Sequence, residues 1–367
     1  MRVLLWYWGR RGGGAQYALC LARALARRPD VALGLSLADR LESLDAFREI
    51  DAALDVVPTF KGLPGALLGP LRMPALRARL LAQARAMRAD LVLSAMNHVW
   101  TPLVAPALPA AGVPFVAAIH DAAPHPGDPA LLWNWRLRTE LRAARAALAF
   151  SAPVAAAVAA IRPDLPVLRM PLGAHLPAAG NGPAAAPVPG QFLFFGRLRA
   201  YKGLDLLRDA FRLLRQRHPA ATLRVVGEGD AESCAPGLAE LPGVTVEQRW
   251  VPDAGMPALL SAAWAVVLPY REASQSGVLP LALALGVPVV ATPVGALAEQ
   301  LRAGQAGLLA EAATPEALAQ AMAAVLDPAR RAALSEAARA EGLRLADWDA
   351  QAATLVEKLR GLGLGAA

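Results

Sequence analysis

The stretch FLFFGRLRAYKGLDLLRDAFRLLRQR, residues 192–217, decides the fold of this chain. Its first four residues form a short apolar run that is typical of a buried strand, and residues 204–217 repeat apolar side chains at helical spacing. Between them lies a loop that is bounded by Gly196 and Gly203. A buried strand, a glycine loop and an amphipathic helix in this order are the unit from which parallel sheets are built.

The same alternation extends outward over all 367 residues, a length that suits two domains. Residues 176–190, LPAAGNGPAAAPVPG, interrupt it with a run of Ala, Pro and Gly that lacks periodicity and indicates a linker. We therefore expect an α/β protein with a first domain at 1–178, a linker at 179–190 and a second domain at 191–341. The expected strands are 3–8, 31–37, 54–57, 91–95, 115–119, 147–150, 192–195, 222–226, 265–268 and 287–292. The expected helices are 15–28, 74–88, 204–217, 278–285, 315–326, 328–341 and 348–359.

Three stretches without Asp, Glu, Lys or Arg are long enough to be transmembrane candidates, at 91–120, 170–196 and 273–298. Prolines interrupt them, so we expect buried strands separated by short turns instead. The first strand-like run begins at Val3 with no cleavage site before it. We therefore expect a cytoplasmic protein without a secretory signal.

Positive charge is concentrated in the first half of the chain. Residues 1–178 carry 20 Lys and Arg against 12 Asp and Glu, whereas residues 179–367 carry 17 against 18. The first half is therefore the one expected to meet an anionic partner, such as a lipid phosphate or a membrane surface. Helix 74–88, in which Arg77, Arg79, Arg85 and Arg88 stand beside Leu76, Leu80 and Met87, permits a membrane contact, but an ordinary sheet-covering helix is the favoured interpretation. No nucleic-acid-binding spacing occurs, so nucleic acid is not an expected partner.

Two candidate sites lie in the first half. One is the loop after the first strand, which holds Arg11, Gly12, Gly13 and Gly14. It opens a helix, where backbone amides favour a bound phosphate or acceptor, and a plain glycine turn is the alternative. The other is the pair His120 and Asp121, which follows strand 115–119 at the carboxyl end, where α/β proteins bind ligands. A buried histidine with a structural role is the alternative there.

Two more candidates lie in the second half. Arg197 and Lys202 share the loop 196–203 and suit a diphosphate, because Arg contacts two oxygens at once and Lys acts as a point charge. A solvated basic loop is the alternative. The other candidate links strand 265–268 to helix 278–285 and offers short polar groups and helix amides to phosphate and sugar hydroxyls. Its members are Ser274, Gln275, Ser276, Gly277 and Val278, and Ser276 also fits the role of helix N-cap.

In order and spacing, three segments of the second half resemble the retaining glycosyltransferases of family 4. They are GRLRAYKGLDLL at 196–207, LRVVGEGD at 223–230 and QSGVLPLALALGVPVVATPVGALAEQL at 275–301. The first half is similar more loosely, through Gly12–Gly14 and His120-Asp121. The resemblance implies the GT-B fold, with two Rossmann-like domains whose parallel sheets face an interdomain cleft. It also implies that segment 342–367 crosses back to the first domain, because Asp347-Trp348 looks like the start of the family's closing helix.

The resemblance further implies roles for single residues. Arg197 and Lys202 would neutralise the donor diphosphate, His120 would approach the transferred sugar, and Asp121 would face the acceptor. The donor-binding residues so implied are Gly196, Trp250, Val251, Glu272, Ser274, Gln275, Ser276, Gly277 and Val278, with the nucleobase near Arg249-Trp250-Val251. The co-substrate is a nucleotide-diphosphate sugar, and no metal is implied. The family commonly shows two glutamates at the start of the donor helix; Glu272 can be the first, and the second is missing.

We therefore expect a retaining glycosyltransferase that moves a sugar from a nucleotide-diphosphate donor to a glycan acceptor in the synthesis of surface polysaccharide or glycoconjugate. A lipid-linked acceptor at the cytoplasmic membrane face is the leading interpretation, and a soluble or protein acceptor is the next. Two alternatives stay open: a nucleotide-sugar epimerase, which would turn over without an acceptor, and a non-catalytic sugar-nucleotide-binding protein.

Overall fold

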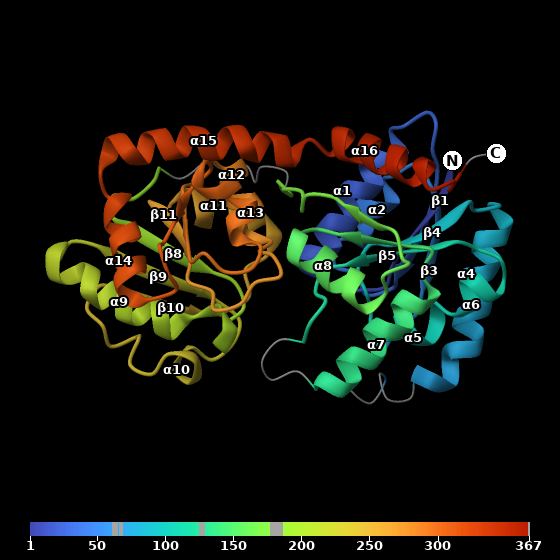
Figure 1. Cartoon of the computed structure of the whole chain (residues 1–367), viewed down its shortest axis with the longest axis horizontal. Helices are drawn as coiled ribbons and strands as arrows, with labels where there is room; N and C mark the ends of the chain where they lie inside the picture. The colour runs from blue at the N-terminus through green and yellow to red at the C-terminus, as the bar shows by residue number, and fades with distance from the viewer. Residues whose placement is uncertain (61–64, 66–68, 125–128, 177–185, 366–367) are drawn as a thin grey trace. The chain divides into compact units, whose positions relative to one another are not determined.

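The computed structural model describes residues 1–60, 65, 69–124, 129–176 and 186–365. The chain divides into two compact units, one of Met1–Pro171 with Asp347–Ala367 and one of Leu172–Ala346. Each unit is built on a parallel sheet flanked by helices (Figure 1), which confirms the expected α/β fold with two parallel-sheet domains. Residues 179–185 of the expected linker lie outside the described residues.

The sheet of the first unit has the strand order β3-β2-β1-β4-β5-β6-β7 in the described part of the chain, and neighbouring strands are parallel. Its strands are β1 (Arg2–Tyr7), β2 (Ala32–Ala38), β3 (Ala53–Val57), β4 (Leu91–Ser94), β5 (Phe115–Ile119), β6 (Ala146–Ala149) and β7 (Val167–Arg169). Its helices are α1 (Gly13–Ala26), α2 (Leu44–Arg48), α4 (Met73–Ala86), α5 (Thr101–Val104), α6 (Ala107–Ala110), α7 (Ala130–Ala143), α8 (Ala152–Ile161) and α16 (Trp348–Gly361).

The last helix of the chain belongs to this first unit because it packs on the first helix. Trp348 of α16 meets Tyr17 of α1 edge to face, with ring centroids 5.5 Å apart. Asp349 pairs with Arg27 at the end of α1. Asp347 caps α16 by accepting a hydrogen bond from the Ala350 amide, which fixes where the helix begins.

The sheet of the second unit has the order β10-β9-β8-β11-β12-β13 among the described residues. Its strands are β8 (Gln191–Phe195), β9 (Thr222–Gly227), β10 (Val244–Gln248), β11 (Ala265–Leu268), β12 (Val289–Ala291) and β13 (Leu308–Leu309). Its helices are α9 (Leu204–Arg217), α10 (Ala231–Cys234), α11 (Met256–Ser261), α12 (Val278–Ala284), α13 (Leu297–Gln300), α14 (Pro315–Ala324) and α15 (Pro328–Ala346). The strands β8 and β11 are buried apart from Gln191, as expected of strands covered on both faces.

Several elements differ from the sequence-based expectation. Residues 91–120 hold the short helices α5 and α6 between two strands rather than strands and turns alone. The expected strand 287–292 is shorter, and the expected helix 328–341 continues to Ala346. The elements that the sequence did not predict include α7, α8, β7 and β10. In the part of the chain that the structure describes, no helix has both the length and the apolar character needed to cross a bilayer.

Candidate functional site

The loops that leave the carboxyl ends of β8 and β9 lie directly against each other. The Gly196 amide donates to the Val226 carbonyl at 3.1 Å, and the Leu198 amide donates to the Glu228 carbonyl at 2.9 Å. A β-carbon on Gly227 would lie 1.8 Å from the Gly196 oxygen, so only glycine fits there. On the other side, a β-carbon at Gly196 would come within 3.9 Å of Val278 at the start of α12. The two glycine loops and this helix start therefore form one surface.

Lys202 is held by the loop that follows β11. Its Nζ lies 3.6 Å from the centroid of the Tyr270 ring, a cation–π contact, and the Tyr270 hydroxyl lies 3.3 Å from Ser276 Oγ. Tyr270 is fully buried, so the ring is a fixed platform. Lys202 and Ser276, which the sequence placed in separate candidate loops, are thus joined through one aromatic side chain.

The backbone after Lys202 has a shape that requires glycine. Gly203 has φ +68°, in the left-handed region, and a β-carbon there would lie 2.0 Å from the Pro269 oxygen. The Arg271 amide donates to the Tyr201 carbonyl at 2.9 Å beside it. This close approach of two backbones sets the position of Lys202 relative to the loop 269–278.

Ser276 is clamped by a side chain that the sequence did not single out. Its amide donates to Gln300 Oε1 at 2.8 Å, and its carbonyl accepts from Gln300 Nε2 at 3.0 Å. The N-cap of α12 is Gly277, with no side-chain capping bond, so Ser276 does not cap the helix. The buried Ser276 hydroxyl turns to Tyr270 instead, and the exposed Gly277 begins the helix.

The loop 196–203 carries Arg197, Arg199 and Lys202, of which the sequence singled out the first and the last as diphosphate ligands. Arg197 is exposed and Lys202 half-buried, and neither forms an ion pair with a carboxylate among the described residues. Arg271 and Arg249 differ, because they pair with Asp205 and Glu247. The unpaired cations beside the start of α12 suit a bound anion with two phosphoryl groups.

The remaining expected donor residues lie around this centre. Ser274 and Gln275 are half-buried in the loop before Ser276, whereas Glu272 is exposed. Trp250 and the buried Val251 follow β10, which is separated from β8 by β9. They therefore lie at the carboxyl end of β10, two strands away from the end of β8.

In the first unit, His120 is buried at the end of β5. Its Nε2 lies 3.2 Å from the Ala95 carbonyl, and its ring packs on Phe150 with centroids 4.4 Å apart. Burial lowers its pKa, with Asp121 and the Ala95 carbonyl opposing, so the ring is neutral at pH 7. Because a carbonyl only accepts, Nε2 of the neutral ring carries the proton in this contact.

The glycine loop of the first unit opens α1. Gly12 is the N-cap, and the first turn holds neither a capping side chain nor an acid. Arg11 and Gly13 are exposed, Gly14 is buried, and Asp121 beside His120 is half-buried. These first amides and Arg11 form an electropositive helix start.

A cluster of aromatic rings near the end of β4 was not predicted from the sequence. His98 packs on Phe60 and Trp100, with ring centroids 5.6 and 5.5 Å away, and its Nδ1 accepts from the Trp100 amide at 3.2 Å. Burial lowers its pKa to about 4, assisted by Arg136. The signal in the sequence was the run Asn97-His98-Val99-Trp100 directly after a strand, at the same sheet end as His120.

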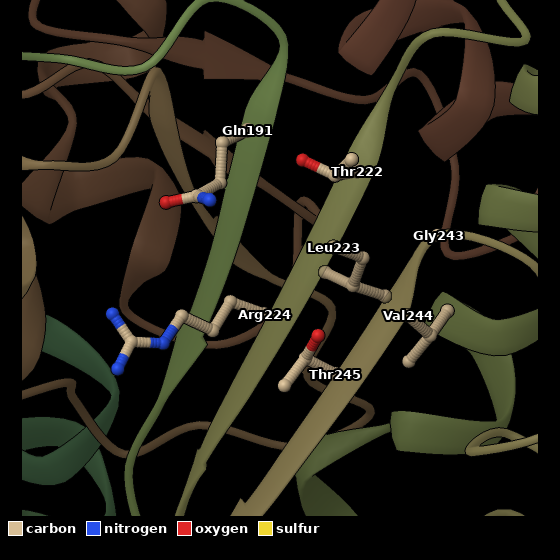
Figure 2. A pocket seen from close by; sticks show the side chains of 7 residues that line it. All are labelled: Gln191, Thr222, Leu223, Arg224, Gly243, Val244 and Thr245. Atoms are coloured by element: carbon tan, nitrogen blue, oxygen red, sulfur yellow. The ribbon is translucent and has the colours of Figure 1, made fainter.

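A hollow of about 380 Å³ in the second unit lies elsewhere (Figure 2). Gln191, Thr222 and Val244, the first residues of β8, β9 and β10, line it together with Arg224. It is therefore at the amino ends of the strands, opposite to the end at which parallel sheets bind ligands. Arg224 is already paired with Glu247 there.

Known proteins are similar to this chain in sequence or in fold. Residues 11–169 match the family model Glycosyltransferase Family 4, and residues 189–328 match Glycosyl transferases group 1. The chain is 34% identical over 191 residues to the D-inositol 3-phosphate glycosyltransferase of Corynebacterium urealyticum, covering 49% of this chain and 44% of that protein. It is 33% identical over 200 residues to the phosphatidyl-myo-inositol mannosyltransferase of Mycobacterium leprae, covering 52% of each. It is 38% identical over 116 residues to the GDP-mannose:glycolipid 4-β-D-mannosyltransferase of Xanthomonas campestris pv. campestris, covering 28% and 30%.

The chain thus spans about half or less of the length of the curated relatives it matches. Among solved structures, HepE of Anabaena in complex with UDP and glucose has a TM-score of 0.75 at 20% identity, covering 98% of this chain and 100% of that one. Sucrose-phosphate synthase of Thermosynechococcus elongatus has a TM-score of 0.76 at 20% identity, covering 100% of both chains. These structures share the GT-B fold with this chain.

Proposed function

Since this chain belongs to the glycosyltransferases of family 4, we propose that it transfers a sugar from a nucleotide-diphosphate donor to a glycan acceptor with retention of the anomeric configuration. The observation that carries the proposal is the pair Arg197 and Lys202, both without carboxylate partners in the described structure. They belong to the surface that also holds Ser276 and the first amides of α12.

In this proposal the surface stabilises the leaving group, which is the nucleoside diphosphate. As the bond between the anomeric carbon and the β-phosphate oxygen breaks, negative charge grows on the diphosphate. Arg197 donates to two oxygens, Lys202 supplies a point charge from its Tyr270 platform, and the amides at Gly277 and Val278 donate at the helix start. The acceptor oxygen bonds to the anomeric carbon on the face that the diphosphate leaves, and the departing phosphate oxygen takes the acceptor proton.

Other residues serve binding in this proposal. The nucleobase lies by Trp250 and Val251, and Ser274 and Gln275 bind sugar or phosphate oxygens. In the first unit, His120 approaches the transferred sugar, and Arg11 and the Gly12–Gly14 amides bind the acceptor beside Asp121. Positive charge comes from side chains and amides, so the proposal includes no metal requirement.

The acceptor in this proposal is a glycan linked to a lipid, at the cytoplasmic face of the membrane, in the synthesis of surface polysaccharide or glycoconjugate. Two relatives are named for transfer to phosphatidyl-myo-inositol and to a glycolipid, which supports this choice. The net positive charge of residues 1–178 also favours an anionic lipid carrier.

A thermal-shift panel of UDP, GDP, ADP, dTDP and CMP tests the donor side. We expect one diphosphate to raise the melting temperature and the same nucleotide sugar to be turned over in EDTA once a lipid-linked glycan is added. Turnover without any acceptor would support an epimerase instead. No stabilisation by any nucleotide would contradict the proposal.

A further inference from the structure

Exposed apolar side chains gather on the first turns of α7. Leu131 is 90% exposed, and Leu132 and Trp135 are 51% and 47% exposed. Large apolar side chains are usually buried. Three exposed ones within five residues therefore indicate a surface that contacts another molecule or a membrane. They lie on one helix of the first unit, drawn in green (Figure 1).

The same face of α7 becomes basic further along. Leu131, Trp135, Arg138 and Arg142 follow one another at steps of four, three and four residues, so they form one stripe along the helix. We call these four residues the outer stripe. Both arginines are exposed, and neither has a carboxylate partner among the described residues. Glu140, the acidic residue of this helix, is buried on the opposite face with Leu137 and Leu141, so the stripe carries positive charge alone.

The helix that the sequence suggested for a membrane contact has a different role. Leu76 and Leu80 of α4 are buried in the core of the first unit, Arg79 pairs with Asp55 of β3, and Arg77 Nε donates to the Leu103 carbonyl at 2.6 Å. α4 thus covers the sheet, which was the favoured interpretation of its pattern. The exposed large apolar side chains cluster on α7 instead, whereas Leu71, just before α4, is a single one.

We propose that the outer stripe, with the neighbouring Leu132, docks on the surface of an anionic lipid bilayer. Leu131, Leu132 and Trp135 enter the interface between headgroups and acyl chains, where an indole ring is favoured, and Arg138 and Arg142 contact the phosphates. Charge complementarity selects this occupant, because a stripe of leucine, tryptophan and unpaired arginine matches a negatively charged apolar interface. The inference rests on the proposed function, because docking on the membrane brings the chain to a lipid-linked acceptor.

Vesicle flotation of the full chain tests the docking without donor or acceptor. The vesicles are phosphatidylcholine alone and a two-to-one mixture of phosphatidylcholine with phosphatidylglycerol. We expect binding to the anionic vesicles and a loss of at least about tenfold in the partition coefficient for Leu131→Ser/Trp135→Ser. Arg138→Ala/Arg142→Ala should lose about fivefold per arginine on anionic vesicles and little on neutral ones.

Matched controls lie in the second unit. Leu343→Ser removes an apolar side chain that is 62% exposed on α15, and Arg217→Ala/Arg330→Ala removes two exposed arginines. Both controls should bind vesicles like the wild type, and melting curves should show that all variants fold. Equal binding by wild type and Leu131→Ser/Trp135→Ser, or no binding by wild type, would overturn the proposal. So would a wild-type dimer in sedimentation that Leu131→Ser/Trp135→Ser converts to monomer without any change in vesicle binding.

The two proposals fail separately. Nucleotide stabilisation in the thermal-shift panel should be the same for Leu131→Ser/Trp135→Ser as for the wild type. Intact nucleotide binding with absent vesicle binding would overturn the docking alone, whereas vesicle binding without any nucleotide response would contradict the proposed function.

Discussion

Lys202 Nζ lies 3.6 Å from the centroid of the Tyr270 ring, although the two residues are far apart in the sequence. The contact positions an ammonium group that has no carboxylate partner among the described residues, and Tyr270 in turn reaches Ser276. A cation that is already oriented loses less conformational entropy when an anion binds. Tyr270 is therefore a positioning residue for the Lys202 ammonium group.

Replacement of Tyr270 should weaken nucleotide binding through Lys202. We expect Tyr270→Leu to lose roughly threefold to tenfold in affinity for the nucleoside diphosphate, as an exposed to partly desolvated cation–π contact implies. Tyr270→Phe keeps the ring and loses only the hydroxyl contact with Ser276, so its affinity should stay close to that of the wild type. Isothermal titration calorimetry on both variants checks this, and equal affinities for Leu and Phe would contradict the role of the ring.

A methyl group at Gly203 should be far more costly than one at an open glycine. Gly203→Ala combines a left-handed backbone with a β-carbon 2.0 Å from the Pro269 oxygen, so we expect at least about 2 kcal/mol lower free energy of unfolding. Gly13→Ala is the matched control, since nothing lies within 4 Å of its β-carbon position. Urea unfolding measures both, and similar losses for the two variants would show that the backbone contact at Pro269 is absent.

Gln300→Ala should loosen the start of α12. The change leaves the amide and carbonyl of the buried Ser276 without their Gln300 partners, a cost of about 1–3 kcal/mol in the free energy of unfolding. Gln305→Ala, which removes an exposed glutamine side chain without a hydrogen-bond partner among the described residues, is the control and should change stability little. Chemical denaturation measures both variants, and an equal or larger loss for Gln305→Ala would show that Gln300 does not clamp Ser276.

Glu140 should make stability depend on pH. Burial raises its pKa to about 8, with Arg136 opposing, and its Oε1 is buried without a hydrogen-bond partner among the described residues. The folded protein therefore holds a proton that the unfolded chain releases near its ordinary pKa of 4.5. Stability from this group is complete below that value and is lost as the pH rises through the folded pKa.

Relative to Glu140→Gln, the free energy of unfolding of the wild type should fall by up to about 4 kcal/mol between pH 5 and pH 9. Urea unfolding over this range measures the difference. Parallel pH profiles for the two proteins would mean that Glu140 is ionised in the fold.

The fold and part of the site could be predicted because they depend on local sequence. The strand, glycine loop and helix of 192–217 are present, and Arg197 and Lys202 lie in that loop. α7 was missed because Leu131 and Trp135 put apolar residues on its outer face, which hides the amphipathic pattern. The strand β10 was missed because Val244–Gln248 is a polar edge strand with no continuous apolar run.

The contacts that join the loops could not be predicted from the sequence. Tyr270 meets Lys202, and Gln300 holds Ser276, only because the chain folds these segments together. Nothing in the local pattern distinguishes Gln300 from the adjacent Glu299. Contacts between side chains of distant segments become known only from the folded structure.

The measurement that tests the central claim most directly is calorimetric titration of the stabilising nucleoside diphosphate into the wild type, Arg197→Ala/Lys202→Ala and the control Arg217→Ala. Two charge-assisted contacts are removed from the double variant, so we expect its affinity to fall at least about 100-fold while the control binds like the wild type. Affinity that survives in the double variant, or that falls equally in the control, would contradict the claim that these two cations bind the donor diphosphate.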